Sequence, residues 1–375
     1  MMSRFLITIV LLLSALQISA QESEPKKQSF LLKGLYWVKT LIDSSAVQGV
    51  DRSYIEQPKR PWAVEVRTDA SETILKMHTD FDFEDDDVMG SMSTVTRNGF
   101  STSLGAWVGY RGYGLGWSKE LTGGDGTTFS FGAAGGSFGI NLRINSFRSH
   151  MPEFTFITDD HGEQYKERYR PEIDDPIKIR SLFLDGYYLF NRKHFSYSAA
   201  YDQALIQRRS AGSLMVGAMF HHARADYSAD SNWEWVYYMK GVGKLKFTQA
   251  SIGVGYAYNW VPARGWLVNV MAMPTLALYN RTTLYDYTIY VVSDKENLEE
   301  ALQDPDAVFE LAEENTIKTP NKVTWNFDAR VALVYNWQRT YLRVFGHFNR
   351  FTYGSDITWG RLYDWKVYAA FGVRF

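Results

Sequence analysis

Cysteine is absent from the 375 residues, so disulfide bonds cannot stabilise the fold. Because no cysteine follows the apolar amino terminus, the sequence also lacks the attachment site of a lipoprotein. Past residue 20, no stretch approaches the ~20 consecutive apolar residues of a transmembrane helix. An excess of positive charge is missing too: the net charge is −2, which does not suggest a nucleic-acid partner.

Aromatic residues, in contrast, are abundant. They make up 16% of the chain, with 24 Tyr and 12 Trp, yet the mean hydropathy is −0.28. Many aromatics without overall hydrophobicity are typical of a membrane β-barrel, which is apolar outside, polar inside and ringed by Trp and Tyr at the interfaces.

The last eleven residues carry the clearest pattern, a strict alternation of two faces. The apolar face holds Trp365, Val367, Ala369, Phe371, Val373 and Phe375. The opposite face holds Lys366, Tyr368, Ala370, Gly372 and Arg374. One face suits lipid and the other a wet lumen. A terminal aromatic at Phe375 resembles the signal that barrel-assembly machinery reads in Gram-negative outer-membrane proteins.

The amino terminus indicates export. Arg4 precedes an apolar run, and Ala20 offers a small residue before Gln21, which predicts a signal peptide over residues 1–20 with cleavage between Ala20 and Gln21. Residues 21–60 form a periplasmic leader. Apolar residues between 30 and 42 recur near helical spacing, so the leader is either a short amphipathic helix or a frayed segment.

Residues 61–375 predict an all-β, transmembrane, antiparallel up-and-down barrel. The alternation gives about twelve strands, with ten to fourteen compatible with the pattern. The expected strands are 72–80, 100–110, 112–120, 127–134, 136–147, 178–190, 212–225, 246–260, 266–279, 323–336, 341–353 and 364–375. The glycines of residues 112–116 fall in a strand, a turn and a strand with no following helix, so they do not predict a nucleotide site.

Loop lengths give an orientation, because periplasmic turns are short and extracellular loops are long. The short connections 261–265 and 336–340 are flanked by a predicted periplasmic aromatic girdle of Tyr258, Trp260, Trp266, Tyr335 and Tyr341. The long segments all fall on the other side: 81–99, 148–177, 226–245, 280–322 and 354–363.

Segment 191–211 breaks this rule, because it is long but periplasmic by parity. One interpretation is a plug at the lumen mouth, in which Asp185 and Asp328 pair with the cationic segment; the other is a plain loop. The cations of the segment are Arg192, Lys193, Arg208 and Arg209. Replacing Arg208 and Arg209 with Ala would raise permeability if the plug interpretation holds.

A specific run begins at Asp185-Gly186-Tyr187-Tyr188-Leu189-Phe190-Asn191. It continues with Gln207-Arg208-Arg209-Ser210 and with Gly255-Tyr256-Ala257-Tyr258-Asn259-Trp260. These residues resemble the family known as domain of unknown function 4421. The resemblance implies a β-rich protein of outer-membrane type, and it implies no activity, cofactor or catalytic residue.

The alternation places a set of charged side chains in the lumen: Asp185, Asp328, Arg330, Arg343, His347, Lys366 and Arg374. They are either a selectivity surface for solutes or an ion-pair network that fills a narrow barrel. The acidic residues of 80–87 and a carboxylate-rich stretch of 286–314 are solvated loops or cation sites, and residues 295–314 are expected to form one or two short helices.

The expected function is therefore a porin-like or small-solute channel, or alternatively a structural or surface-interaction barrel without conductance. An enzyme is the least favoured class, because Ser210 with His221 or His222 shows no catalytic spacing. We expect no cofactor and no metal site. The expected partners are outer-membrane lipid, lipopolysaccharide and the barrel-assembly machinery, and the barrel is expected to be a monomer.

Overall fold

The computed structural model describes residues 49–83, 88–97, 100–149, 152–160, 163–169, 173–229, 231–232, 236, 241–292, 308–319, 321–354 and 358–375. The predicted signal peptide and the predicted helix of the leader lie outside these residues. None of the helices within the described ranges is long and apolar enough to cross a membrane.

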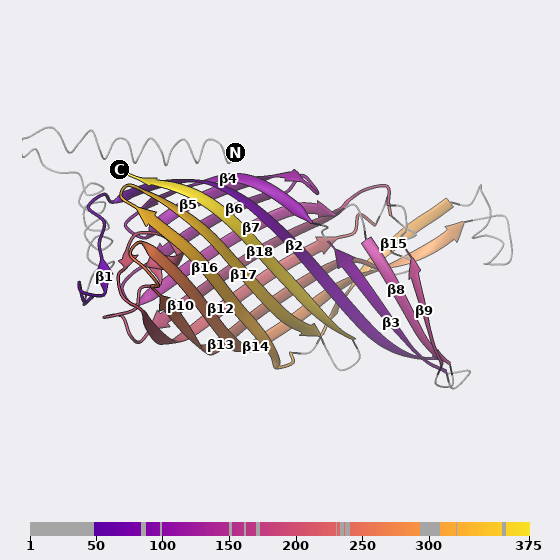
Figure 1. The fold of residues 1–375 in the computed structure, drawn as a ribbon. Coiled ribbons are helices and arrows are strands. Elements are labelled where there is room, and N and C mark those ends of the chain that lie inside the picture. The colour runs from indigo at the N-terminus through magenta and orange to yellow at the C-terminus, as the bar shows by residue number, and fades with distance from the viewer. Residues whose placement is uncertain are drawn as a thin grey trace, which may run out of the picture. The chain divides into compact units, whose positions relative to one another are not determined.

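Twelve antiparallel strands close into a barrel, as predicted (Figure 1). Each strand pairs with its neighbours in the barrel, and the last pairs with the first, with Val373 opposite Val64. In order around the barrel the strands are β2 (Trp62–Phe83), β4 (Ser101–Tyr110), β5 (Tyr113–Thr122), β6 (Thr127–Ala134), β7 (Phe138–Ser149), β10 (Ile177–Leu189), β12 (Ala211–Asp226), β13 (Val242–Trp260), β14 (Trp266–Val292), β16 (Thr324–Trp337), β17 (Thr340–Gly354) and β18 (Thr358–Arg374).

The first strand begins ten residues earlier than predicted, at Trp62 instead of residue 72. Its inward positions include Glu65, Arg67 and Asp69, whereas the outward Val66 is 57% exposed. The first ten residues of β2 were not predicted as strand, because the charged residues of the lumen face leave apolar residues at only every second position.

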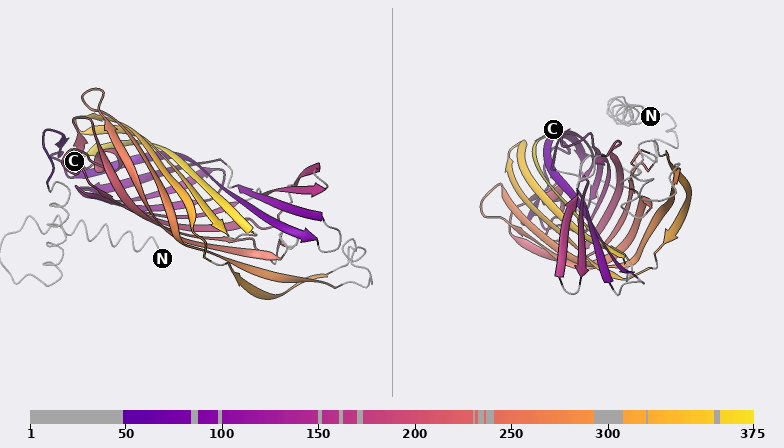
Figure 2. Two further views of the ribbon diagram at one scale, coloured as in Figure 1. Left: turned by 90° about the horizontal axis from the view of Figure 1, so that it is seen from below. Right: turned by 90° about the vertical axis from the view of Figure 1, so that its right-hand side faces the viewer.

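Within the described ranges, four more strands extend the sheet beyond the barrel, at the end opposite the carboxyl terminus (Figures 1 and 2). β3 (Val88–Arg97) pairs with β2, β8 (Pro152–Asp160) with β3, β9 (Glu163–Tyr169) with β8, and β15 (Val308–Lys318) with β14. We call these four strands, with the parts of β2 and β14 that they pair, the extension.

The extension corrects several loop predictions. Residues 308–314 are strand, not helix, while residues 293–307 lie outside the described part. Asp80 and Asp82 belong to β2 and not to a loop, and residues 84–87 are not described. Segment 354–363 is not a long loop either, since β18 begins at Thr358.

The two faces of the barrel wall separate as the alternation predicts. On β18, Val367 and Phe371 are 43% and 50% exposed on the outside, whereas Lys366 and Arg374 are buried inside. The same outward apolar character recurs on the other strands, for example at Leu214 on β12. The outside is therefore compatible with lipid and the inside with charge.

The barrel end that holds the carboxyl terminus has short turns, as predicted. Arg111 and Gly112, both at positive φ (51° and 93°), form the two-residue hairpin between β4 and β5. Trp266 and Tyr335 pack with ring centroids 4.7 Å apart near the turn of residues 261–265. The prediction that Tyr341 joins this girdle is wrong: its side chain points inward and is 1% exposed.

Candidate functional site: the lumen and its plug

The connection between β10 and β12 folds into the barrel. We call residues 194–207 the plug; they contain a single helical turn, α3 (Ser198–Tyr201), and the short strand β11 (Ile206–Gln207). Almost all of its side chains are buried: Phe195, Ser196, Tyr197, Ser198, Ala199, Ala200, Tyr201, Asp202, Gln203, Leu205 and Gln207. The central residues of segment 191–211 therefore lie inside the barrel.

Glycine in the wall makes room for the plug. A Cβ added at Gly139 of β7 would lie 2.7 Å from the Cε1 atom of Tyr197, closer than any real contact. The wall also satisfies the plug's backbone: the Asn259 side-chain amide donates to the carbonyl oxygen of Ser196 at 2.9 Å. A plug so fitted is part of the folded core and not a loose loop.

Arg330 is the centre of one buried charged cluster. Its Nη2 atom lies 3.0 Å from Asp185 Oδ2 and its Nε atom donates to Asp328 Oδ1 at 3.4 Å. Its Nη1 atom donates to the Tyr197 hydroxyl at 2.7 Å, which ties the plug to the wall. Tyr187 donates its hydroxyl proton to Asp328 at 2.6 Å and accepts from Arg330. One guanidinium therefore joins two carboxylates of different strands with one residue of the plug.

Glu65 organises a second cluster nearer the short-turn end. It accepts from Arg343 Nη2, Arg67 Nε and the Tyr341 hydroxyl, each at 2.7 Å. Arg343 also donates to the backbone oxygen of Tyr201 in the plug. These contacts span β2, β17 and the plug, so they fix the plug from a second side.

Two further cations of the lumen lie on β18, and each contacts a residue of another element. Lys366 Nζ is 2.8 Å from Asp69 Oδ1, and Arg374 donates to the side-chain oxygen of Gln203 in the plug at 3.2 Å. Both cations are buried, so each is balanced by an ionic or polar partner inside the lumen.

A third cluster lies toward the extension. Asp364 accepts from Arg143 Nη2 at 2.7 Å and from Thr73 Oγ1 at 3.0 Å, and it lies 3.4 Å from His347 Nε2. His347 is among the predicted lumen residues, whereas Arg143 and Asp364 are not. Their alternation with outward Leu142 and Tyr363 was a usable signal, although nothing in the sequence names their partner.

All seven predicted lumen charges thus lie inside the barrel. The predicted partners of Arg208 and Arg209 are wrong: neither side chain contacts Asp185 or Asp328. Arg208 is exposed and its Nη2 atom lies 2.8 Å from Glu56 Oε2, while Arg209 lies over the ring of Tyr54 at 5.6 Å.

Residues 51–56 bind to the residues at both ends of the plug, and we call them the latch. Their strand β1 (Ile55–Glu56) pairs with β11, the backbone N–H of Arg208 donates to the oxygen of Tyr54 at 2.7 Å, and that of Asp51 donates to the oxygen of Lys193 at 2.9 Å. The β1–β11 sheet is separate from the barrel sheet. The end of the leader is therefore attached to the plug.

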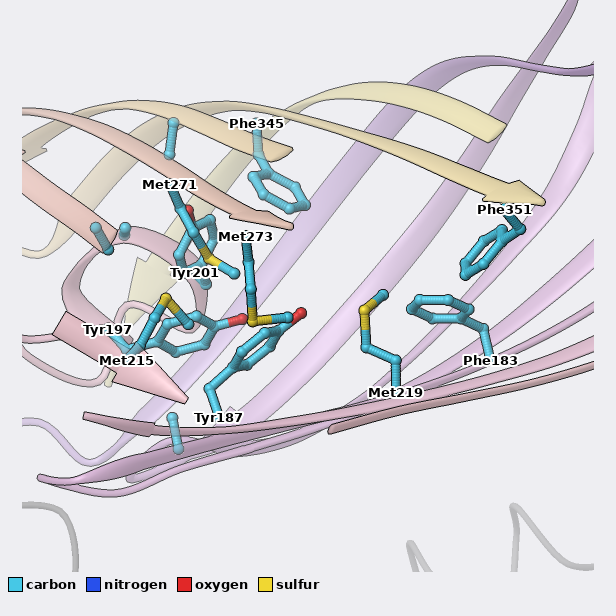
Figure 3. Packing of buried hydrophobic residues seen from close by; sticks show 14 of the residues in the cluster. Phe183, Tyr187, Tyr197, Tyr201, Met215, Met219, Met271, Met273, Phe345 and Phe351 are labelled. Carbon is cyan, nitrogen blue, oxygen red and sulfur yellow. The ribbon is translucent and has the colours of Figure 1, made fainter. Parts of the chain in front are cut away.

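Apolar side chains fill much of the remaining lumen (Figure 3). They come from β10, β12, β14, β17 and the plug, and point toward one another: Phe183, Tyr187, Tyr197, Tyr201, Met215, Met219, Met271, Met273, Phe345 and Phe351. Beside them lie a cavity of about 90 Å³ between plug and wall and a second of about 40 Å³ toward the extension. Arg143 and Phe183 line both.

The sequence also matches a family model. The family model described as "Domain of unknown function (DUF4421)" matches residues 50–375. No curated protein matches the sequence. Among solved structures, the outer membrane protease OmpT of Escherichia coli is 9% identical, with 85% of this chain and 97% of that chain covered and a TM-score of 0.36. The β domain of the Bordetella autotransporter BrkA is 10% identical, with 84% and 100% covered and a TM-score of 0.31. The toluene transporter TodX of P. putida is 9% identical, with 84% and 90% covered and a TM-score of 0.25.

Proposed function

Because this chain belongs to the DUF4421 family, whose description names no activity, we propose a function from the structure itself. The protein is an integral outer-membrane barrel that does not conduct solutes in its resting state and acts through its extension at the cell surface. The observation that carries this proposal is the filled lumen beside a sheet that continues well past the barrel.

The filled lumen argues against a steady porin. A passive pore needs a continuous wet path, whereas here the plug is bound to the wall by Arg330, Arg343 and Arg374. Passage of a solute would first require breaking these buried contacts, each costly to leave unmade. A gated channel remains the second candidate function. It is favoured by the latch, because a movement of the latch would act on the plug through the pairing of β1 with β11.

The extension supports a surface role because two barrel strands, β2 and β14, continue into it and are longer than a membrane requires. A spanning strand needs ~9–11 residues. β2 has 22 residues and β14 has 27, and both continue as part of a sheet beyond the barrel rim. Residues spent on ordered structure outside the bilayer are available for contact with a partner.

We further propose that the barrel is not an enzyme. Ser210 precedes β12, and its hydroxyl accepts from the backbone N–H of Val261 at 2.9 Å. His221 lies eleven residues along the same strand, roughly 36 Å away at ~3.3 Å per residue. Its Nδ1 atom contacts the Tyr353 hydroxyl. These residues therefore offer no nucleophile and base in reach of each other.

The location, partners and orientation belong to the same proposal. The chain is exported before it inserts, and the barrel-assembly machinery recognises the strand that ends at Phe375. The folded barrel is a monomer surrounded by outer-membrane lipid and lipopolysaccharide. The short-turn end with the latch faces the periplasm and the extension faces outward, as the loop lengths favour.

Single-channel recording in planar bilayers tests the resting state. Folded barrel, verified by heat-modifiable migration, should be silent, and the Arg208→Ala/Arg209→Ala variant should stay silent, because both side chains lie outside the lumen. Steady conductance of the unmodified barrel would refute the proposal in favour of a pore.

Complementation tests the role of the extension. A barrel in which residues 152–169 are replaced by a short linker should still insert into the outer membrane. It should fail to restore the wild-type phenotype in cells that lack the protein. Full restoration by this variant would remove β8 and β9 from the function.

A further inference from the structure

Basic side chains gather on the outside of the barrel wall, just past the apolar surface and toward the extension. They lie on β10, β12, β13 and β14, which are side by side in the sheet (Figure 1), and on β15, which pairs with β14. Each is exposed or half-buried, and we call them together the basic band: Lys178, Arg180, Arg224, Lys244, Lys246, Arg281 and Lys318. Their outward direction follows from the alternation, since Arg224 shares a face of β12 with the exposed Leu214, while Ala223 is buried inside.

The register of the strands brings three of these cations into one row. Arg180 of β10 is opposite Arg224 of β12, and Arg224 is opposite Lys246 of β13. The Cβ atoms of directly opposite residues lie ~5 Å apart, and like charges in such positions repel each other. The row is therefore destabilising unless negative charge lies over it.

Carboxylates on the same face balance little of this charge. Asp226 is the one acid among the described outward positions of residues 178–184, 220–226, 244–250, 279–285 and 316–318. It already lies 2.9 Å from Arg224 and accepts from the backbone N–H of Ser228 at 3.3 Å. Lys178 and Arg180 form no ion pair with any residue that the structure describes. The band thus keeps an excess of positive charge that is open to an anionic partner.

Tyrosines of β14 hold part of the band in place. The ring centroid of Tyr285 lies 4.4 Å from Lys246 Nζ and 5.3 Å from Lys244 Nζ, and Lys246 donates to the Tyr285 hydroxyl. Arg281 lies over the ring of Tyr279 at 5.6 Å. One ring thus keeps two ammonium groups together, and side chains that are already ordered lose less conformational freedom when they bind an anion.

The height of the band along the barrel matches that of lipid headgroups. On β13 the outward side chains between Ala250 and Trp260 are apolar or aromatic. These ten steps cover roughly 33 Å at ~3.3 Å per residue, or about 25 Å along the axis of a barrel whose strands tilt by ~40°. An outer-membrane barrel has an apolar belt of ~25 Å, so Lys246 lies just beyond the acyl chains of the surrounding lipid.

We propose that the basic band binds a phosphorylated lipid of the outer leaflet. Its phosphate groups lie over the row of Arg180, Arg224 and Lys246, and its acyl chains lie along the outward apolar side chains of Leu184 and Phe220. Guanidinium groups suit phosphate because they donate two parallel hydrogen bonds to it, and lysine adds a point charge. The inference rests on the proposed place of the barrel in the outer membrane, with the extension outward, but not on the silent lumen.

The probe for the test is fluorescent lipid A that carries two phosphate groups. Fluorescence anisotropy follows its binding to purified, folded barrel in neutral detergent micelles, at low and at high sodium chloride. We expect saturable binding that weakens with salt, and no displacement of the probe by phosphatidylcholine or by inorganic phosphate. Displacement by inorganic phosphate would indicate a site for free anions, and a lack of saturable binding would remove the site; either result overturns the proposal.

The triple variant Arg180→Gln/Arg224→Gln/Lys246→Gln removes the row of cations. A basic residue near an anionic lipid surface contributes about fivefold in affinity, so this variant should bind lipid A roughly 100-fold more weakly. If the triple variant does not fold, as judged by heat-modifiable migration, Arg180→Gln alone replaces it and should bind about fivefold more weakly. Unchanged affinity in a folded variant would refute the assignment.

The matched control is Lys59→Gln/Arg264→Gln/Arg339→Gln. It removes the same number and types of cation from exposed positions at the short-turn end and should leave the affinity for lipid A nearly unchanged. Equal losses in the two triple variants would show that net charge alone attracts the lipid, which would also refute the site. Because binding is measured in detergent, a conducting barrel would overturn the proposed resting state and leave this inference standing.

Discussion

Replacing Glu65 with Gln tests whether the buried charges of the lumen stabilise the barrel. Glu65 is fully buried and accepts from three donors at 2.7 Å. The substitution keeps the volume and leaves Arg343, which is 2% exposed, facing an amide. Removing one partner of a buried ion pair costs about 3–5 kcal/mol, because the other charge stays buried and unpaired.

A second glutamate provides the matched control. Glu56 lies 2.8 Å from Arg208, nearly the same separation, but the two side chains are 42% and 53% exposed. Exposed ion pairs contribute about 0–1 kcal/mol. Glu56→Gln should therefore change the stability little, and the difference between the two variants isolates the effect of burial from that of distance.

The assay is equilibrium unfolding of the refolded barrel by urea in lipid vesicles, followed by heat-modifiable migration and tryptophan fluorescence. We expect Glu65→Gln to lower the free energy of unfolding by about 3–5 kcal/mol at an unchanged slope. The reasoning fails if Glu65→Gln and Glu56→Gln lower the stability equally. It also fails if Glu65→Gln changes nothing, since the buried carboxylate would then be dispensable.

Three other predictions follow from packing, lipid contact and orientation. Gly139→Ala should lower the free energy of unfolding in urea by about 1–3 kcal/mol through its clash with the plug, while Gly186→Ala, whose Cβ would meet nothing closer than 3.9 Å, should not; equal effects would contradict the fit. Phe371→Asp, on the half-exposed outer face of β18, should reduce insertion, because a lipid-facing Arg or Lys costs ~2–4 kcal/mol and Asp somewhat less; normal amounts of folded barrel in outer membranes would argue otherwise. A protease site inserted within 295–314 should be cleaved in intact cells and one at Ala263 should not; the reverse pattern would invert the orientation.

The barrel was predictable where lipid imposes a two-residue period. On β18 the outer face is apolar at every second position, and the predicted strand 364–375 covers all but the first six residues of β18. The extension was missed because a strand outside the bilayer has no lipid-facing side, so a sequence such as Val308–Lys318 shows no contrast between faces.

The lumen charges were placed correctly by parity, but their partners were not. Arg343 and Glu65 are 278 residues apart, and which inward side chains meet depends on the tilt and stagger of the strands. The plug was predicted from its length, aromatics and cations. The contacts of the plug were not predicted, because its tyrosines enter the lumen and the arginines that follow it do not. Arg208 is exposed to solvent.

The pairing of β2 with β18 has a consequence for how the barrel reaches one final register. Acids on the first strand meet bases on the last two, Glu65 with Arg343 and Asp69 with Lys366, across the junction where the chain's two ends join. A slip of one residue would turn Glu65 and Asp69 toward lipid, and a slip of two would separate acid from base by roughly 7 Å along the strand. Closure of the barrel therefore favours the native register. Any other pairing of β2 with β18 leaves unpaired charges in the barrel wall, whereas the native pairing neutralises them.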